Sequence, residues 1–343
     1  GLGGAFVAGN ARVNLDATTN THLGAKIAIE PNGTIDVVWY DDRTGTFEVY
    51  LGRSSDGGVT WTNTVVRAPL TAGDAISPNL VVEANNTITV VWMDSRTPGS
   101  FYNIWLSRTT TGGTSWSETG PINNDVGTDL HESPVVAFAA GTTYVVWGTD
   151  RNNPGVTKDL YSATSGDGFV SNTALNDIPN DALGANDHMN PAVAFDSTGN
   201  LVCVWVDNRS GGFYDVQFAK LVSGTWGDYV RISDDAAGTH NHFNPAIALE
   251  ASGTLDCVWS DDRTGLPEIF FSRSPNSGAS WTVSQSFPAG QNLRVNSDLV
   301  NTASHILPCI AISPDGTFNV LWGDDRQGAF SEIFTARGQF KTP

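Results

Sequence analysis

The sequence predicts an all-β protein, a six-bladed β-propeller built from four-stranded antiparallel blades. Three observations lead to this fold class. The segment Val-Val-Trp39-Tyr-Asp41-Asp-Arg43 returns in near copies until six have appeared along the 343 residues. Gly, Pro and Trp are frequent, at 36, 16 and 11 residues, and Asp far outnumbers Glu, which favours tight turns over helices. Only 16% of the residues are charged and 40% are hydrophobic, so the chain has a sizeable core.

Each repeat is interpreted as four short strands. The first is an apolar run that begins with proline in five of the six copies, as in Pro191-Ala-Val-Ala-Phe, and it ends in a Gly or Asn turn. The second strand ends in the tryptophan motif. The third alternates aromatic and polar residues, as in Phe47-Glu-Val-Tyr-Leu, and a Gly-rich turn leads to a fourth strand. Such a unit matches one propeller blade.

The two ends of the chain complement each other. The sixth repeat stops after its third strand, Glu332-Ile-Phe-Thr-Ala, whereas residues 11–16 resemble the fourth strands at 230–234 and 293–296. We expect residues 1–16 to supply the outer strand of the last blade, which closes the ring and removes two exposed sheet edges. Residues 1–343 are therefore predicted to form a single domain.

Charge and hydropathy exclude several classes of function. The net charge of −18 argues against binding to nucleic acid or to an anionic membrane. No apolar segment approaches the 18 residues of a membrane span, so we expect no membrane insertion. The Gly-Leu-Gly-Gly start does not resemble a signal peptide, and we expect any export signal to have been removed from a secreted or cell-surface protein.

The tryptophan motif places charged residues at one end of every blade. Trp, Asp and Arg at alternate positions share one face of a strand, where we expect them to form a hydrogen-bonded staple. Histidine lies three residues before the proline position in five blades, with Ala75 as the exception, and is expected to join the staple. The members are Trp39, Asp41, Arg43, Trp92, Asp94, Arg96, Trp147, Arg151, Trp205, Asp207, Arg209, Trp259, Asp261, Arg263, Trp322, Asp324 and Arg326, with His22, His131, His188, His242 and His305. Ten of the eleven tryptophans occupy repeated positions, and only Trp105 falls outside them.

A competing interpretation makes this ring of His and Asp a metal or ligand site on the channel axis. No two histidines have a short ligand spacing other than His240 and His242, and the acidic pairs Asp234-Asp235, Asp261-Asp262 and Asp324-Asp325 lack the spacing of an EF-hand loop. We predict no cofactor and leave calcium open.

The turn between the third and fourth strands carries a second motif. Its residues are Ser54, Asp56, Gly58 and Trp61 in the first repeat, Trp116 in the second, and Asn276 and Trp281 in the fifth. This pattern resembles the Asp-box, or BNR, repeat of sialidases and sialidase-like propellers. The resemblance covers nearly the whole chain, and it implies that the Asp-box residues are structural and lie on the face away from the active site.

The catalytic pattern of sialidases is not matched. Sialidases resemble one another in an arginine cluster, whose first member enters an innermost strand two residues before a proline. Here that position holds Leu23, Ile76, Glu132, Met189, Phe243 and Ile306. We therefore expect a non-catalytic binding or scaffold module for a glycan or a surface protein. The alternative is a glycoside-active enzyme that uses other residues on the channel face, and a third possibility is a structural unit of a larger surface protein.

Ligand residues are sought where the repeat symmetry breaks. Blade three has Thr149 in place of the motif Asp, blade two lacks the histidine, and blade one lacks the proline. The connections 176–190 and 289–307 are the longest, and we expect them to shape a pocket over the channel. The candidate binding residues are Tyr40, Asp42, Glu132, Asp150, Arg151, His188, His240 and His242.

Overall fold

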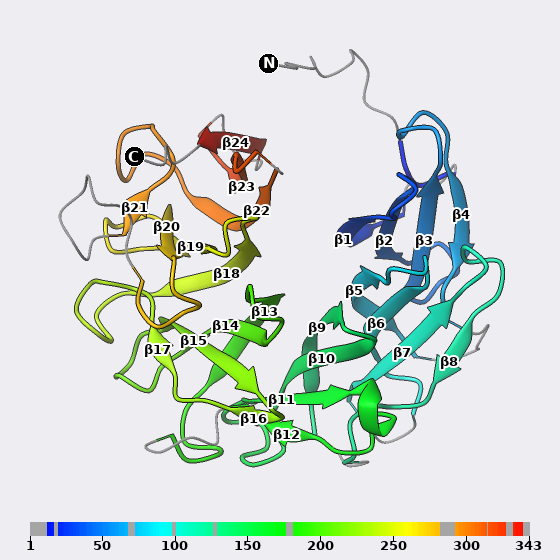
Figure 1. Ribbon diagram of the computed structural model, residues 1–343, viewed down its shortest axis with the longest axis horizontal. Coiled ribbons are helices and arrows are strands. Elements are labelled where there is room, and N and C mark those ends of the chain that lie inside the picture. Colours follow the sequence, from blue (N-terminus) through cyan, green and yellow to red (C-terminus); the bar gives the residue numbers. More distant parts are fainter. Residues whose placement is uncertain are drawn as a thin grey trace. The chain divides into compact units, whose positions relative to one another are not determined.

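A computed structural model describes residues 12–16, 20–67, 73–97, 101–125, 129–175, 181–281, 292–313, 315–326 and 332–338 (Figure 1). The chain is divided into two compact units, Gly1–Ile122 and Asn123–Pro343. Among the described residues the only helix is a single 3-10 turn, Ser165–Asp167. No helix in this part of the chain is both long and apolar enough to cross a membrane.

The first unit contains two antiparallel sheets in which each strand pairs with the next one along the chain. Blade one consists of β1 (His22–Ile29), β2 (Ile35–Asp41), β3 (Glu48–Ser54) and β4 (Thr62–Val65). Blade two consists of β5 (Ala75–Val82), β6 (Ile88–Asp94), β7 (Asn103–Thr109) and β8 (Ser117–Thr119).

The second unit contains four sheets of the same order, except that in blade four both β16 and β17 pair with β15. Blade three consists of β9 (His131–Ala139), β10 (Thr142–Thr149), β11 (Asp159–Thr164) and β12 (Thr173–Ala174), and blade four of β13 (His188–Phe195), β14 (Leu201–Asp207), β15 (Asp215–Val222), β16 (Thr225–Trp226) and β17 (Val230–Arg231). Blade five consists of β18 (His242–Leu249), β19 (Leu255–Asp261), β20 (Glu268–Ser274) and β21 (Leu293–Arg294), and blade six of β22 (His305–Ile312), β23 (Phe318–Asp324) and β24 (Glu332–Gly338).

The hydrophobic core lies between the faces of successive blades. On β14, Val202, Val204 and Val206 pack with β19 of the next blade, whereas Leu201, Cys203 and Trp205 pack with β10 and β11 of the preceding one. Alternate residues of a strand face opposite sides of its sheet, so a blade that is covered on both sides needs an apolar residue at nearly every position. This explains why the second strands are continuous hydrophobic runs.

Every first strand begins with a bulge. Its pairing with the second strand shifts register just before the proline position. The residue at the shift has a left-handed φ of 49° to 64°, and it is Gly24, Ser77, Ser133, Asn190, Asn244 or Leu307. Such a bulge re-aims the residues at the strand entrance. In blade one a Cβ on Gly24 would lie 2.7 Å from Cε1 of Tyr40, so Gly replaces the usual larger residue there.

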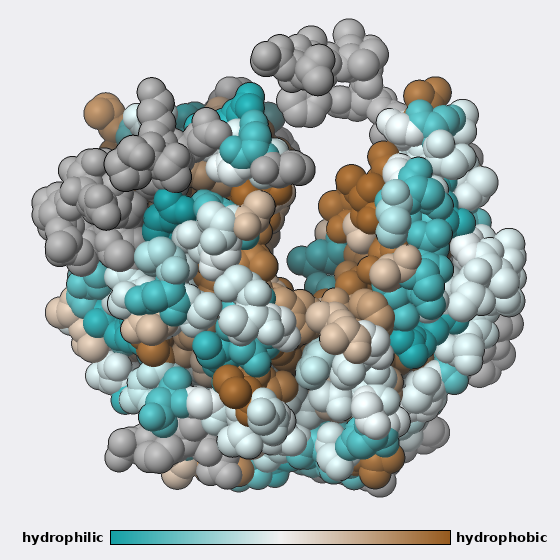
Figure 2. Space-filling view, viewed as in Figure 1, coloured by the Kyte–Doolittle hydropathy of each residue, from teal (hydrophilic) through white to brown (hydrophobic). Residues whose placement is uncertain are grey.

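Apolar side chains remain exposed on the first strands of blades one and six. They are Leu23, Ile27 and Ile29 on β1 and Leu307 on β22. Figure 2 shows this hydrophobic surface over β1 and β22, while polar residues cover the outer strands of each unit.

The predicted ring closure lies partly outside the described residues, because residues 1–11 belong to the undescribed part. Residues 12–16 lie along blade one, where Asn63 accepts from the Leu15 N–H at 2.7 Å and donates to the Val13 carbonyl at 3.0 Å. In the described part of blade six, β24 has no fourth strand beside it. Closure by the N-terminal strand therefore stays a prediction. The connections 176–190 and 289–307 also lie partly outside the described residues, at 176–180 and 289–291.

Candidate functional site

The Trp-x-Asp-x-Arg motif forms the same set of hydrogen bonds in five blades. The indole Nε1–H donates to the Asp Oδ2 at 2.7 to 3.0 Å, and the arginine main-chain N–H donates to Oδ1 at 2.9 to 3.3 Å. The guanidinium also donates to the same carboxylate, as from Arg209 to Asp207 at 2.5 Å. All five carboxylates are fully buried. A buried charge needs such a complete set of partners.

Each arginine of the motif also covers an aromatic ring. The guanidinium carbon lies 3.7 to 4.3 Å from the ring centroid, and the rings are Tyr50, Trp105, Tyr161, Tyr229, Phe270 and Phe334. Trp105 therefore belongs to the repeat, contrary to its interpretation from the sequence. In five blades the ring faces the motif tryptophan across the second and third strands, but blade four has Gln217 there and takes Tyr229 instead. Cation–π contact adds to the ion pair.

The residue between Asp and Arg holds the chain that enters the first strand. Its side chain accepts a hydrogen bond from the main-chain N–H of the residue before the histidine position. Asp42 accepts from Thr21 at 3.1 Å and Asp150 from Leu130 at 2.7 Å. Ser95, Asn208, Asp262 and Asp325 do the same in the other four blades. Two candidate binding residues, Asp42 and Asp150, thus contact the backbone.

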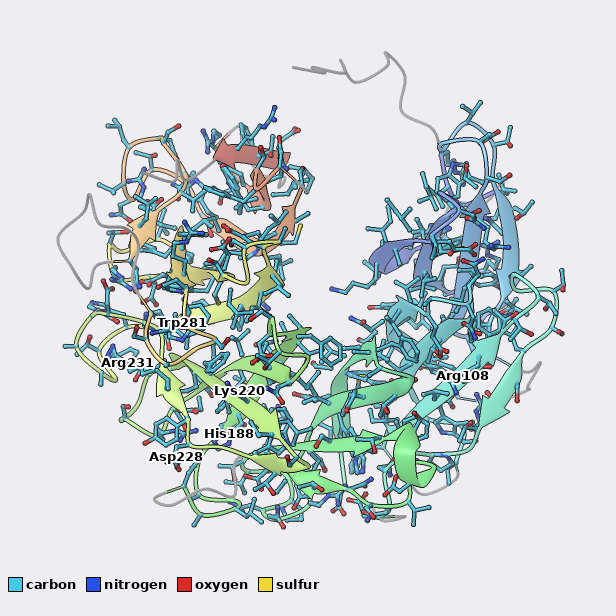
Figure 3. All side chains as sticks on the ribbon, viewed as in Figure 1. Arg108, His188, Lys220, Asp228, Arg231 and Trp281 are labelled. Atoms are coloured by element: carbon cyan, nitrogen blue, oxygen red, sulfur yellow. The ribbon has the colours of Figure 1, made fainter. Side chains whose placement is uncertain are left out.

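The histidines of blades four, five and six are fully buried. In each, Nδ1 lies 2.5 to 3.0 Å from a main-chain carbonyl oxygen, so Nδ1 carries a proton and donates. In each, Nε2 lies 2.8 to 3.3 Å from carboxylate oxygens, as between His188, which Figure 3 labels, and Asp181 at 2.8 Å. Burial lowers the pKa of His242, but the nearby carboxylates of Asp235 and Asp261 outweigh it and raise the pKa to about 9. The pKa of His188 is also raised, by the same balance.

A second set of carboxylates was missed in the sequence. Asp16, Asp125, Asp181, Asp235 and Asp298 each contact a histidine through Nε2. They lie six or seven residues before that histidine, a spacing that could have identified them. Asp181, Asp235 and Asp298 come from segments that follow a fourth strand of the second unit, so their contacts join one blade to the first strand of the next.

The described residues include three clusters of His, Asp and Glu whose possible ligand atoms lie close enough together to hold a metal ion. They are Asp181, His188 and Asp207; Asp215, Asp235 and His242; and Glu268, Asp298 and His305, whose ligand atoms lie within 4.8 Å of one another. In each group an arginine already neutralises a carboxylate. Arg209 lies 2.9 Å from Asp181, Arg231 lies 3.0 Å from Asp215 and Arg294 lies 3.5 Å from Glu268. We assign these carboxylates to ion pairs within the protein.

Blade two replaces the histidine without losing the positive charge. Arg67 is buried where Ala75 leaves room, and its Nη1 lies 3.4 Å from Asp94 Oδ2. Its Nη2 donates to Glu48 and, at 2.9 Å, to the Gly73 carbonyl. A guanidinium thus fills the role of the imidazole.

The eight candidate binding residues are divided between the two units. Tyr40 and Asp42 belong to the first unit, whereas the other six lie on blades three, four and five of the second unit. Tyr40 packs edge-on against Phe47, and His188 and His242 are buried. Arg151 pairs with Asp125 at 2.8 Å. Glu132, whose side chain is 23% exposed, pairs with Lys158 at 3.1 Å, and His240, whose side chain is 40% exposed, lies 2.9 Å from Asp235.

The bulges bring other polar groups to the same end of the second unit. We define the bulge arc as Glu132, Ser133, Met189, Asn190, Phe243 and Asn244, which begin the first strands of blades three to five. These strands, β9, β13 and β18, contact one another in order (Figure 1). All six residues are partly exposed. The bulge arc thus combines a carboxylate, a hydroxyl, two amides and one aromatic ring.

The turns expected at the other end of the blades are closed by their own side chains. Asp56 accepts from the main chain of Val59 and Thr60 at 3.0 and 2.9 Å, and Trp61 Nε1–H donates to the Gly58 carbonyl at 3.0 Å. Asn276 accepts from Ser280 N–H at 3.0 Å.

In the first unit, hollows of about 500 and 350 Å³ lie beside Trp116 and beside His22.

Comparisons with known proteins identify the fold alone. No family model and no curated protein matches the sequence. A protein of unknown function from Dyadobacter fermentans is similar in structure, with TM-score 0.62 and 13% identity over 93% of this chain and 94% of that one. An α-L-arabinanase of Penicillium chrysogenum, solved with arabinobiose, gives TM-score 0.61 and 13% identity over 93% of both chains. A Hadza microbial sialidase gives 0.58 and 14%, over 92% of this chain and 65% of its own.

The chain is a six-bladed β-propeller. Glycoside hydrolases of two kinds share this fold with it, as does a protein without assigned function. At these identities the likeness does not transfer a substrate or a catalytic residue.

Proposed function

We propose that this propeller is a non-catalytic carbohydrate-binding module of an extracellular or cell-surface protein, and that the bulge arc contacts the glycan. The observation that carries the proposal is that the charged residues at this end of the blades already have hydrogen-bonding and ion-pair partners within the protein. The motif Asp side chains are fully buried and bonded to Trp and Arg. They hold the blade together and are not accessible to a sugar.

Glycoside hydrolysis ordinarily needs two accessible carboxyl groups, about 5 to 9.5 Å apart, on either side of the bond that breaks. The carboxylate pair Asp181 and Asp207 is fully buried beside His188, and Asp215 and Glu268, in the two similar clusters, are fully buried as well. At the six bulge positions Glu132 is the one acidic residue, and Lys158 neutralises it. A single paired carboxylate fits binding better than cleavage.

The chemistry of the bulge arc suits a neutral sugar. Amide and hydroxyl groups exchange hydrogen bonds with sugar hydroxyls, and an aromatic ring such as Phe243 packs against the apolar face of a sugar ring. The net charge of −18 disfavours sulfated or uronic glycans by repulsion. The Penicillium arabinanase, which has a similar fold, was solved with arabinobiose. Arabino-oligosaccharides are therefore the first ligands to test.

The test is calorimetric titration with arabinobiose and longer arabino-oligosaccharides, together with a glycan array and an assay for reducing sugar. We expect binding without release of sugar. Phe243→Ala and Asn244→Ala should weaken binding at least 10-fold, since each removes about 1.4 kcal/mol or more of contact. Val59→Ala, at an exposed turn at the opposite end of blade one, should leave the affinity unchanged.

Two outcomes would overturn the proposal. Reducing sugar released by the wild type and lost in Glu132→Gln would favour the alternative of a glycoside-active enzyme with non-standard residues. Binding to no glycan on the array would favour a structural unit of a larger surface protein.

A further inference from the structure

Blade three lacks the carboxylate around which the other staples are built. In five blades the motif Asp accepts from the tryptophan Nε1–H, the arginine main-chain N–H and the guanidinium. Thr149 occupies that position in blade three, at the end of β10. The tryptophan and the arginine are retained, as Trp147 and Arg151. The donors are therefore present without the acceptor that they share elsewhere.

The indole of Trp147 is left without a partner. Trp147 is fully buried, and its Nε1 has no hydrogen-bond partner among the described residues. The main-chain N–H of Arg151 reaches Thr149 Oγ1 at 3.3 Å, which replaces one carboxylate oxygen. Arg151 Nε lies 2.8 Å from Asp125 Oδ2, but it lacks hydrogen-bond geometry to that oxygen. A buried donor without an acceptor costs about 1 to 3 kcal/mol, so such a site calls for an occupant.

The threonine side chain is too short to serve as that acceptor. Its oxygen is two bonds from Cα, whereas the oxygens of Asp are three bonds away, and Trp147 Nε1 has no partner where the outer carboxylate oxygen accepts in the other blades. Neighbouring carboxylates are held elsewhere. Asp150 accepts from Leu130 and Gly155, and Asp159 accepts from Asn152 at 2.7 Å.

The guanidinium of blade three also has one carboxylate partner fewer. In blade four, Arg209 pairs with two carboxylates, Asp207 and Asp181. In blade three, Arg151 pairs with Asp125 alone among the described residues. Burial and the Arg151 charge lower the pKa of His131 to about 3, so this histidine is neutral and adds no charge to the site. An added anion would give Arg151 the second negative partner that Arg209 has in blade four.

We propose that blade three binds one small monovalent anion, such as a halide, which accepts from Trp147 Nε1 and faces Arg151 in place of the missing carboxylate. The anion completes the third staple and fixes the entrance of β9 next to the bulge arc.

The test compares thermal unfolding in sodium chloride or bromide with unfolding in sodium gluconate at equal ionic strength, because gluconate is too large to enter. The wild type should show a saturable rise in Tm with halide, of about 2 to 4 °C. Thr149→Asp supplies the carboxylate and should abolish this dependence while raising Tm in gluconate. A crystal grown in bromide should show anomalous density beside Trp147 Nε1.

A matched control creates the same vacancy in another blade. Asp207→Thr in blade four should acquire a halide dependence that the wild-type blade lacks. If that variant fails to fold, Trp147→Phe removes the donor and should lose the halide effect while keeping its stability in gluconate. A wild-type Tm that does not respond to halide, or a water molecule with no bromide signal at the site, would overturn the proposal.

Discussion

At the scale of single residues, the histidines show how the same side chain takes opposite states in equivalent positions. His242 faces Asp235 and Asp261, which raise its pKa to about 9, and its Nδ1 donates to the Tyr214 carbonyl. His131 has a single carboxylate partner and a nearby guanidinium, and its pKa falls to about 3. Burial lowers the pKa of both rings; two carboxylates outweigh it at His242, whereas at His131 the Arg151 charge adds to it.

The protonation of His242 should make the free energy of unfolding fall at alkaline pH. His242 binds its proton up to about pH 9 when folded but only up to about 6.5 when unfolded, so its stabilisation is complete below pH 6.5 and is lost as the pH rises to 9. His242→Gln should lower the free energy of unfolding by about 2 kcal/mol at pH 6 and by much less at pH 9.5. Urea unfolding at several pH values measures this difference.

His131→Gln is the control for that series. Because His131 is neutral in the folded protein, the difference between this variant and the wild type should not change between pH 7 and pH 9. An equal alkaline response in both variants would contradict the assigned charge of His242.

At the scale of elements, the opposite end of the blades carries a second repeated cluster. A carboxylate after the first strand, a residue early in the second strand and a basic residue late in the third strand meet there. In blade five these are Glu250, Asp256 and Arg273. Burial raises the pKa of Asp256 to about 8, and Glu250 adds to the shift against the pull of Arg273. Blades two and four have Thr89 and Val202 in place of this Asp, beside Arg108 and Lys220 (Figure 3).

Asp256→Asn should therefore stabilise the protein. The folded Asp256 keeps its proton up to about pH 8 whereas an unfolded Asp releases it near pH 4, so this residue lowers stability progressively as the pH rises between those values. The neutral amide removes that cost, and we expect a gain of about 1 to 2 kcal/mol at pH 8 and almost none at pH 4.

Asp36→Asn in blade one offers a graded comparison. Burial raises the pKa of Asp36 only to about 6, because Arg53 donates to it at 2.8 Å. Its gain at pH 8 should be smaller than that of Asp256→Asn. Denaturant unfolding of both variants at pH 4, 6 and 8 makes the comparison, and a loss of stability at pH 8 in Asp256→Asn would refute it.

At the scale of the whole molecule, stability depends on blades that bury each other's faces. The clusters around Trp205 and around Trp259 each combine residues from two successive blades, so no blade has a core of its own. The histidine contacts cross the same boundaries, as from His188 on β13 to the Lys158 carbonyl of the preceding blade. In such a repeat the terminal blades are the weakest, unless the ends of the chain meet.

Deleting residues 1–16 tests the predicted closure. Asp16 pairs with His22 at 3.1 Å and with Arg43 at 3.4 Å, and Asn63 binds the main chain of Val13 and Leu15. The double variant Asp16→Asn with Asn63→Ala therefore removes these contacts of residues 12–16 with blade one. If residues 1–16 also supply the outer strand of the last blade, the deletion should lower Tm by roughly 5 °C more than this double variant does. A peptide of residues 1–16 added to the shortened chain should restore Tm, and equal Tm values for the deletion and the double variant would contradict closure.

The sequence by itself determined the strands, their order and the staple at the end of each second strand. Periodicity carries that information, because strands have a period of two and every blade repeats the same turn chemistry. The tertiary structure decided which polar and charged side chains have all their hydrogen-bonding partners. The partners of His188, the replacement of a histidine by Arg67 and the ring under Arg96 come from other strands or from the preceding blade, and no local spacing encodes such contacts fully. The unpartnered Trp147 indole likewise becomes visible only when its hydrogen bonds are traced in space.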